Sequence, residues 1–377
     1  MKILISPDSY KGSLTAMEVA DNIEKGIKKV LPGANVEKIP MADGGEGTVQ
    51  ALVDAHDGVI DQKEVTGPLG NKVQADYGFL PGEKTGVIEM AAASGLTLVA
   101  NKDPMKATTY GTGELIKEVL NKGAEKIIIG IGGSATVDGG VGAARALGIS
   151  FRDENGEEIG PGGGELGKIA EINFSRRDPA LDNVTIKVAC DVTNPLYGKN
   201  GAAYVYGPQK GAGEEMVEIL DNNLRHLAAV VKEHTGRDMQ SIKGAGAAGG
   251  LGAGLCVFLD AQLVSGVDLV SEANHLEEHM KFKDVVITGE GRIDGQTVQG
   301  KAPIGVARLA KKYNLPVIGI AGCFGKGADK VYDHGIDAIF SLDNEDSSTP
   351  EALRSLTENV FRLLMVCKEW KQTENIF

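Results

Sequence analysis

The residues best suited to chemistry lie in short polar segments that combine carboxylates, glycines, hydroxyls and a lysine or arginine. Most of these segments follow an apolar stretch that is predicted to be a β-strand. Carboxylates can hold Mg²⁺ or accept a proton, while cations and backbone N–H groups can hold phosphate, so this combination suits phosphoryl transfer. The segments contain Asp8 with Lys11, Asp43 with Glu46, Ser134 with Asp138, Asp191 with Asn194, Lys210, and Glu290, Arg292 and Asp294 with Lys301.

The most informative segment is the loop of residues 132–140, GGSATVDGG, between an apolar run at 127–131 and an alanine-rich helical pattern. Strand, small-residue loop and helix start together aim backbone N–H groups at an anion. Ser134 and Thr136 add hydroxyl donors, and Asp138 could hold a metal. The alternative is a tight strand-to-helix turn that binds nothing, because glycine also serves close packing.

Other catalytic patterns are absent from the sequence. It contains no nucleophile elbow, HExxH motif, Walker A motif or protein-kinase signature. His275 and His279 lie four residues apart beside Glu277 and Glu278, which favours a polar helix face over a zinc site. The four cysteines are widely spaced, which predicts reduced thiols in a cytoplasmic protein.

The elements that must position these residues form an α/β rhythm at both chain ends. We expect strands at 2–5, 36–40, 284–288, 317–321 and 338–341, and helices from Thr15 with Glu18 in a capping box, from about 303 to 312, and from Thr349 onward. Residues 289–297 are expected to be a loop. In open parallel sheets ligands bind at the carboxyl ends of the strands, where the polar segments fall.

The middle of the chain has a different pattern. Short strands at 64–66, 73–80 and 86–89 with turn residues between them predict an antiparallel meander. Thr112 is expected to cap a helix, and a long helix at about 214–234 is expected to bury one apolar stripe; the glycine-rich residues 244–254 indicate a close backbone crossing or a loop. We therefore expect one α/β domain from residues 1–62 and 284–377, and a second, mixed α/β domain from residues 63–283 inserted in it. The apolar stripe that we expect the helix at about 214–234 to bury consists of Met216, Ile219, Leu220, Leu224, Leu227 and Val231.

Composition narrows the function classes. The chain has 377 residues, 42% of them hydrophobic, with 52 glycines and a net charge of -13. This acidic balance argues against nucleic-acid partners and against an anionic membrane surface. No apolar stretch approaches the length of a membrane span, and the N-terminal apolar run is too short for a signal peptide.

Six segments together resemble the bacterial type-1 glycerate kinase family across essentially the whole chain. One departure is Val137, where the family more often has asparagine; Asp138 beside it is intact. The segments are SPDSYKGSLTAMEVA, MADGGEGT, GGSATVDGGVGAARALG, CDVTNPLYGKNGAAYVYGPQKGA, GAAGGLGAGL and TGEGRIDGQTVQGKAPIGVA.

The resemblance implies ATP-dependent phosphorylation of D-glycerate to a phosphoglycerate with Mg²⁺ in the cytoplasm. It also implies a flavodoxin-like domain, an inserted domain and a site in the cleft between them. The 2-hydroxyl is favoured over the 3-hydroxyl as acceptor, the chain is expected to be a monomer or homodimer, and small-molecule D-glycerate is the expected partner, with no nucleic acid and no membrane.

Residue roles follow from matching this chemistry to the segments. We expect ATP phosphates near Gly132, Gly133, Ser134 and Thr136, with help from Lys210, and metal binding by Asp43, Glu46, Asp138 or Glu290. Glycerate is expected to contact Asp8, Lys11, Asn194, Arg292 or Lys301. Asp191 is favoured over Asp294 as the base, and Lys11 and Arg292 are the other catalytic candidates.

Two other function classes fit parts of the sequence. Residues 130–135 match the GxGxxA pattern of a dinucleotide-dependent oxidoreductase, with Asp153 at about the expected distance for a ribose contact, but Asp153 lies in a turn-like DENG segment. A sugar-acid sensor without catalytic activity is the second alternative, and the many acidic residues of metal-ligand type disfavour it.

Overall fold

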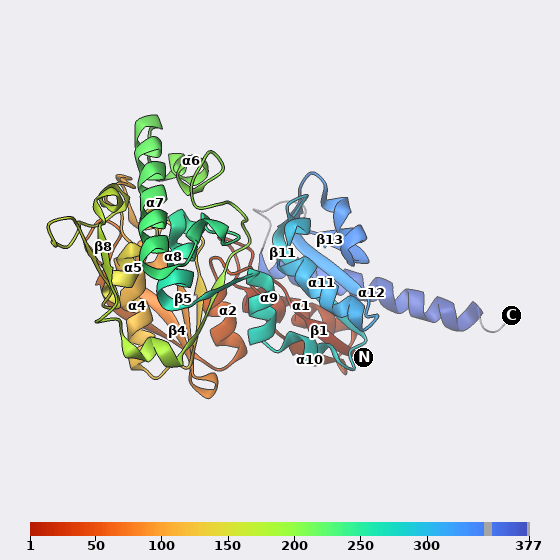
Figure 1. Cartoon of the computed structure of the whole chain (residues 1–377). Helices are drawn as coiled ribbons and strands as arrows, with labels where there is room; N and C mark the ends of the chain where they lie inside the picture. The colour runs from red at the N-terminus through yellow and green to blue at the C-terminus, as the bar shows by residue number, and fades with distance from the viewer. Residues whose placement is uncertain (343–348, 375–377) are drawn as a thin grey trace. The chain divides into compact units, whose positions relative to one another are not determined.

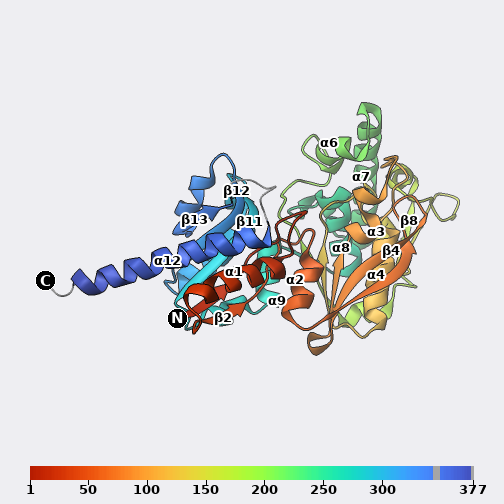
Figure 2. The same cartoon turned by 180° about the vertical axis from the view of Figure 1, so that it is seen from behind.

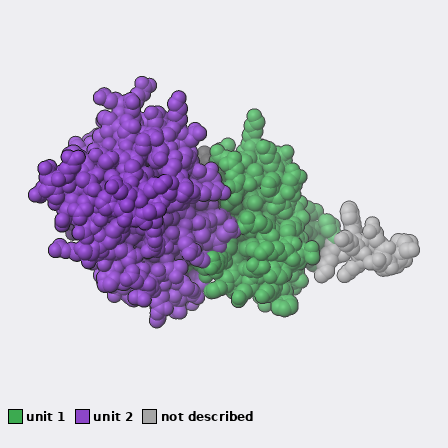
Figure 3. Space-filling model, in the orientation of Figure 1, with its two compact units in different colours: residues 1–43, 50–55, 270–377 green, residues 44–49, 56–269 purple. Residues whose placement is uncertain are grey.

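The chain folds into two compact units in the computed structural model, which describes residues 1–342 and 349–374 and, among these, the side chains of all but 368–374. The first unit consists of Met1–Asp43, Gln50–Ala55 and Val270–Phe377, and the second of Gly44–Val49 and His56–Leu269 (Figure 3). The units thus divide the chain elsewhere than at the expected positions 62 and 283. Residues 56–62 join the second unit because the strand from Val59 pairs there, and residues 270–283 join the first.

The sheet of the first unit contains five parallel strands in the order β13-β12-β11-β1-β2. Numbered along this unit alone, the order is 2-1-3-4-5, which is that of flavodoxin-like folds. The expected flavodoxin-like domain is therefore confirmed. The strands are β1 (Lys2–Ile5), β2 (Asn35–Lys38), β11 (Val285–Ile293), β12 (Val317–Phe324) and β13 (Ala338–Ser341).

Helices cover both faces of this sheet. The helices α1 (Ala16–Val30) and α12 (Pro350–Glu374) pack side by side on one face (Figure 2), and α11 (Ala302–Lys312) covers the other (Figure 1). The expected capping box opens α1: Glu18 N donates to Thr15 Oγ1, and Thr15 N donates to Glu18 Oε2. The remaining helices are α2 (Thr48–Ala55), α9 (Gly266–Ala273), both of which lead from one unit into the other, and α10 (Leu276–Met280).

The second unit is built on a mixed sheet of six strands in the order β10-β9-β6-β5-β4-β3. β3 (Val59–Thr66), β4 (Lys72–Leu80) and β5 (Thr85–Glu89) form the expected antiparallel meander. β5, β6 (Lys126–Gly130), β9 (Thr185–Ala189) and β10 (Gln262–Val264) run parallel. A small antiparallel ribbon pairs β7 (Ser150–Arg152) with β8 (Glu171–Asn173).

Helices and glycines complete the core of the second unit. Gly249 and Gly254 lie directly against the backbone of residues 136–140, where any larger side chain would collide, so the expected close backbone crossing is confirmed. The helices are α3 (Ala91–Ser94), α4 (Tyr110–Asn121), α5 (Val141–Ala146), α6 (Ala202–Tyr206), α7 (Glu214–Thr235) and α8 (Leu251–Leu259).

Three local expectations were wrong. Residues 289–293 are not a loop, because β11 continues in register with β12 as far as Ile293. Thr112 does not cap α4, which begins at Tyr110 after Thr109. The buried stripe of α7 is rotated: Met216 and Ile219 are exposed, and Val217 is buried instead.

Two further features bear on function class. Among residues 1–342 and the described part of the C-terminal helix, no helix is long and apolar enough to cross a membrane. The four cysteines are free thiols, as expected.

Candidate functional site

The first unit places its polar segments at the point where its strand order reverses. From β1 the chain proceeds to β2 on one side, while β11 pairs with β1 on the other. A ligand site forms at the carboxyl edge of such a reversal point in open α/β sheets. Asp8 follows β1 there, and Glu290 lies near the end of β11.

Asp8 has the most unusual environment of this group. Its side chain is 6% exposed, and its Oδ1 accepts hydrogen bonds from Ser9 N (2.6 Å) and Ser9 Oγ (3.3 Å). Within the described residues, Oδ2 accepts no hydrogen bond. Burial, together with the carboxylates of Asp43 and Glu290, raises the pKa of Asp8 to about 7. Asp8 therefore offers one unused carboxylate oxygen in a site that disfavours its charge.

Glu290 is held by two residues from the segment that follows β11. Its Oε1 accepts from Thr297 Oγ1 (2.6 Å), and its Oε2 accepts from Lys301 Nζ (2.9 Å). Burial raises the pKa of Glu290, although Thr297 and Lys301 act in the opposite direction. The structure thus pairs two predicted site residues, Glu290 and Lys301, with each other.

Other predicted residues lie around the same edge. The charge of Lys11 acts on Asp8, and Lys11 is exposed without an ion-pair partner among the described residues. Asp43 and Asp294 act electrostatically on Lys301. Arg292 is exposed, with its Nε 3.5 Å from Asp294 Oδ2. The first unit therefore brings together Asp8, Lys11, Asp43, Glu290, Arg292, Asp294 and Lys301 as one charged cluster.

The second unit presents the glycine loop (residues 132–140) at the carboxyl end of β6. Gly132 and Gly133 are exposed, and Gly133 has a φ of +72° that favours glycine. In the part of the chain that the structure describes, the N–H groups of Gly132, Gly133 and Ser134 donate to no protein acceptor. Consecutive free N–H groups of this kind can bind an anion.

Lys210 lies inside the protein beneath this loop rather than on its surface. It is 1% exposed, and its Nζ donates to Ser134 Oγ (2.6 Å) and to Thr136 O (2.7 Å). Burial lowers the pKa of Lys210 to about 7, while the charge of Asp138 acts in the opposite direction. The structure therefore places Lys210 in contact with the predicted phosphate loop.

Asp138 fastens the same loop to the neighbouring helices. Its carboxylate is 1% exposed and accepts from Thr109 N and Oγ1 (both 2.8 Å), Gly140 N (3.2 Å) and Gly142 N (3.2 Å). Burial raises the pKa of Asp138, and the hydrogen bonds from Thr109 counteract this. These contacts make Asp138 a structural cap of α4 and α5 and lend no support to its predicted role as a metal ligand.

Two further loops lie at the same sheet edge of the second unit. Asp191 follows β9 and is exposed, and its Oδ1 accepts from Gly266 N at 3.1 Å. The amide of Asn194 is engaged internally, donating to Asn200 O and accepting from Tyr206 OH. Glu46 is exposed and lies near Glu89, a residue that the sequence reasoning missed. Glu89 ends β5 and accepts from Val49 N at 2.9 Å, so its place at a strand end was the available signal.

The predicted metal ligands do not form a ready-made cage. The described residues contain no group of three or more His, Cys, Asp or Glu side chains arranged around one metal position. Asp43 and Glu290 belong to the first unit, whereas Glu46 and Asp138 belong to the second. Mg²⁺ commonly keeps several waters and binds one or two carboxylates plus substrate phosphates, so a magnesium site does not need such a cage.

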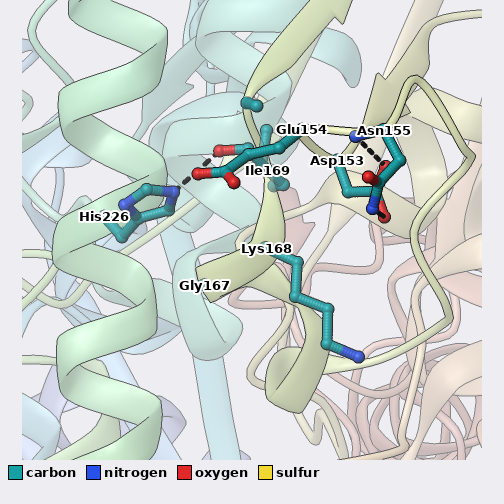
Figure 4. A pocket seen from close by; sticks show the side chains of 8 residues that line it. Asp153, Glu154, Asn155, Gly167, Lys168, Ile169 and His226 are labelled. Atoms are coloured by element: carbon teal, nitrogen blue, oxygen red, sulfur yellow. Dashed lines mark hydrogen bonds between the residues drawn. The ribbon is translucent and has the colours of Figure 1, made fainter.

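One cavity of about 240 Å³ lies apart from all these residues, between α7 and the β7–β8 ribbon (Figure 4). Its polar side chains are satisfied locally: Asp153 accepts from Asn155 N and Glu157 N, and His226 Nε2 is 2.7 Å from Ile169 O. Asp153 directly follows β7, but β7 belongs to the separate two-stranded ribbon and not to the sheet that contains β6. This arrangement does not support the ribose contact required by the oxidoreductase alternative, in which the two strands are neighbours in one parallel sheet.

Each of the two α/β units carries polar segments at the carboxyl edge of its parallel strands, an arrangement suited to a small-molecule kinase. A family model described as "Glycerate kinase family" matches residues 3–369. The chain therefore belongs to the glycerate kinase family, and it is an enzyme, a phosphotransferase with an alcohol group as acceptor.

Individual relatives agree over the full length. The chain is 53% identical over 376 residues to a glycerate kinase of Halalkalibacterium halodurans, covering 98% of this chain and 99% of the relative. It is 54% identical over 364 residues to a glycerate 2-kinase of Escherichia coli, covering 96% of each. A crystal structure of putative glycerate kinase 2 from Salmonella typhimurium LT2 is similar with a TM-score of 0.92 and 50% identity, over 98% of this chain and 99% of that chain.

Proposed function

We propose that the enzyme transfers the γ-phosphoryl group of ATP to the 2-hydroxyl of D-glycerate, giving 2-phosphoglycerate and ADP, in the cytoplasm. The observation that carries this proposal is the run of free N–H groups at Gly132, Gly133 and Ser134, which matches the needs of nucleotide phosphates. The name of the Escherichia coli relative, glycerate 2-kinase, supports the 2-hydroxyl as acceptor.

The charged cluster of the first unit is suited to the acceptor. The unused Oδ2 of Asp8 can accept a hydrogen bond from a glycerate hydroxyl. Lys11 has no ion-pair partner among the described residues and can neutralise the glycerate carboxylate. Lys301 and Arg292 lie near carboxylates of the same unit, which supports Lys11 as the main cation for the substrate.

Mg²⁺ would be held by Asp43 and Glu290 together with the nucleotide phosphates, and when bound it would supply charge neutralisation at the transferred phosphoryl group. Glu46 remains a further candidate from the second unit. Residues of the chain then orient the acceptor hydroxyl, keep the other hydroxyl of glycerate away from the phosphoryl group, and receive the proton of the acceptor hydroxyl. Phosphoryl transfer depends almost entirely on such positioning and electrostatic stabilisation.

For the proton acceptor we propose Asp191 before Asp294. Asp191 follows β9, the neighbour of β6 in the sheet, so it shares the sheet edge from which the glycine loop emerges. Asp294 belongs to the first unit and does not share that sheet edge, and its Oδ1 accepts from Gln296 N (2.7 Å) near Arg292. A carboxylate that takes the proton of an attacking hydroxyl contributes a large factor to the rate.

Asp191→Asn is expected to lower kcat by about 100-fold or more, because the amide cannot accept the hydroxyl proton. ATP affinity should change by less than about threefold, since only proton transfer is removed. Steady-state kinetics with a circular dichroism check of folding would measure this. Near-normal turnover in a folded variant would exclude Asp191 and leave Asp294 as the candidate, with Asp294→Asn as the matched comparison.

The position of phosphorylation is tested by phosphorus NMR of the product formed from Mg-ATP and D-glycerate. The proposal expects the phosphate on carbon 2, in keeping with the name of the Escherichia coli relative. A phosphate on carbon 3 would keep the kinase assignment and reject the 2-hydroxyl as the acceptor.

A further inference from the structure

Lys210 occupies a position that the proposed reaction does not explain by itself. It ends the short 3₁₀ turn Pro208–Lys210, and Gly211 follows with a φ of +96°, which turns the chain away. A lysine that is 1% exposed is unusual, because burying an ammonium group is costly unless its hydrogen bonds are satisfied. Its place inside the second unit therefore needs a specific reason.

The contacts of Lys210 all point to the glycine loop. Nζ donates to Thr136 O at 2.7 Å and to Ser134 Oγ at 2.6 Å, so it joins two alternate residues of one loop. Thr136 Oγ1, in the same loop, is buried and has no hydrogen-bond partner among the described residues. Asp138 is the charged group that acts on Lys210, and its own oxygens are already bound by Thr109, Gly140 and Gly142.

Lys210 and Asp138 hold different parts of the glycine loop. Lys210 holds Ser134 and Thr136, and Asp138 holds the start of α5. Gly132 and Gly133, just before the part held by Lys210, are exposed with free N–H groups. A side chain that is 1% exposed and donates two hydrogen bonds to the loop supports those N–H groups without itself being presented to a ligand.

We infer that Lys210 is a positioning residue, which acts through Ser134 and Thr136 to hold the N–H groups of residues 132–134 in place for the nucleotide phosphates. This inference rests on the proposed function, in which the glycine loop binds ATP. It differs from the prediction from sequence, in which Lys210 helps to bind the phosphates. The lowered pKa of Lys210 agrees with an amine enclosed by neutral partners.

Lys210→Met is the main test, because methionine fills a similar volume and removes the donor. We expect the Kd for ATP, measured by calorimetry with the full-length protein, to rise at least about tenfold, while the KM for D-glycerate changes by less than about twofold. Lys102→Met is the matched control: Lys102 is exposed and its Nζ donates to Gln209 O beside the same turn. That control should bind ATP as the wild type does.

A double-mutant cycle separates positioning from direct contact. If Lys210 acts through the loop, Lys210→Met and Ser134→Ala should weaken ATP binding non-additively, because each breaks the same contact. Additive losses would show that Lys210 contacts the phosphates directly and would overturn the inference. Unchanged ATP affinity in Lys210→Met would overturn it as well.

Two measurements keep the test decisive. If Lys210→Met does not fold, Ser134→Ala with intact Lys210 must still raise the Kd for ATP at least about threefold, and wild-type affinity there would contradict the inference. Lys210→Met tests a purely space-filling role, because methionine fills a similar volume without the donor, and propylamine added to Lys210→Ala should restore ATP binding by returning the amine. ATP binding is measured without glycerate, so a failure of the proposed reaction would appear separately, as absent turnover by the wild type.

Discussion

Asp8→Asn is expected to lower kcat by about 100-fold or more and at the same time to raise the melting temperature. The carboxylate lies at the point of strand reversal, is 6% exposed and has an unused Oδ2. Its proposed task is to orient the acceptor hydroxyl, and small errors of position cost large factors in rate. The same burial beside Asp43 and Glu290 makes the ionised form unfavourable to folding.

The stability effect of Asp8 has a defined dependence on pH. Its folded-state pKa is raised from 3.8 to about 7, so between these values the folded protein keeps a proton that the unfolded chain has lost. Folding stability therefore falls by a few kcal/mol as the pH rises from about 4 to 7, and then levels off. The amide in the Asp8→Asn variant cannot ionise, so the gain in melting temperature should be small at pH 4 and at least about 5 °C at pH 8.

Calorimetric melting of the wild type and Asp8→Asn at several pH values would measure this dependence. Asp333→Asn is the matched control, since Asp333 is an exposed carboxylate in a 3₁₀ segment of the same unit. An Asp8→Asn variant that is inactive and also less stable than the wild type at pH 8 would mean that Asp8 is needed for folding. That result would contradict the claim that the Asp8 carboxylate serves turnover but lowers the stability of the folded protein.

Lys301→Met is expected to reduce both turnover and stability. Removing the ammonium leaves Glu290, whose side chain is 8% exposed, close to the carboxylates of Asp8 and Asp43 without its cation. The loss of stability should be about 1–2 kcal/mol, since Lys301 itself is one-third exposed and partly screened by solvent. Turnover should fall by about 100-fold or more because the carboxylates lose their arrangement.

The double variant Glu290→Gln/Lys301→Met distinguishes these two effects. It removes the uncompensated charge and should recover most of the lost stability, while activity stays low because the carboxylate and its cation are both gone. Denaturant unfolding and steady-state rates would be measured on the wild type, both single variants and the double variant. Recovery of turnover in the double variant would show that the ion pair is not part of the site.

Much of the fold could be predicted because its signals are local. β1, the capping box of α1 and the strands β4 and β5 of the meander each depend on neighbouring residues and appeared where expected, whereas β3 begins at Val59, five residues before the expected strand at 64–66. The rotated face of α7 was not predictable in the same way. Met216 and Val217 are equally apolar, and the packing of the whole unit decides which of them faces inward.

The site residues likewise differ in whether local or long-range information reveals their role. Residue types and strand ends were enough to nominate Asp8, Glu290, Lys301 and the glycine loop. The burial of Lys210 and the capping role of Asp138 depend on partners far along the chain, Ser134 for one and Thr109 for the other. A sequence shows that such residues are charged but does not show which of them the fold encloses.

The most direct test of the central claim is the initial rate of ADP formation from Mg-ATP by the full-length protein, with and without D-glycerate. We predict that ADP forms in proportion to added D-glycerate and in a one-to-one ratio with phosphoglycerate, with little formation when L-glycerate replaces it. ADP formation that does not respond to D-glycerate, in a folded protein that binds ATP, would contradict the account.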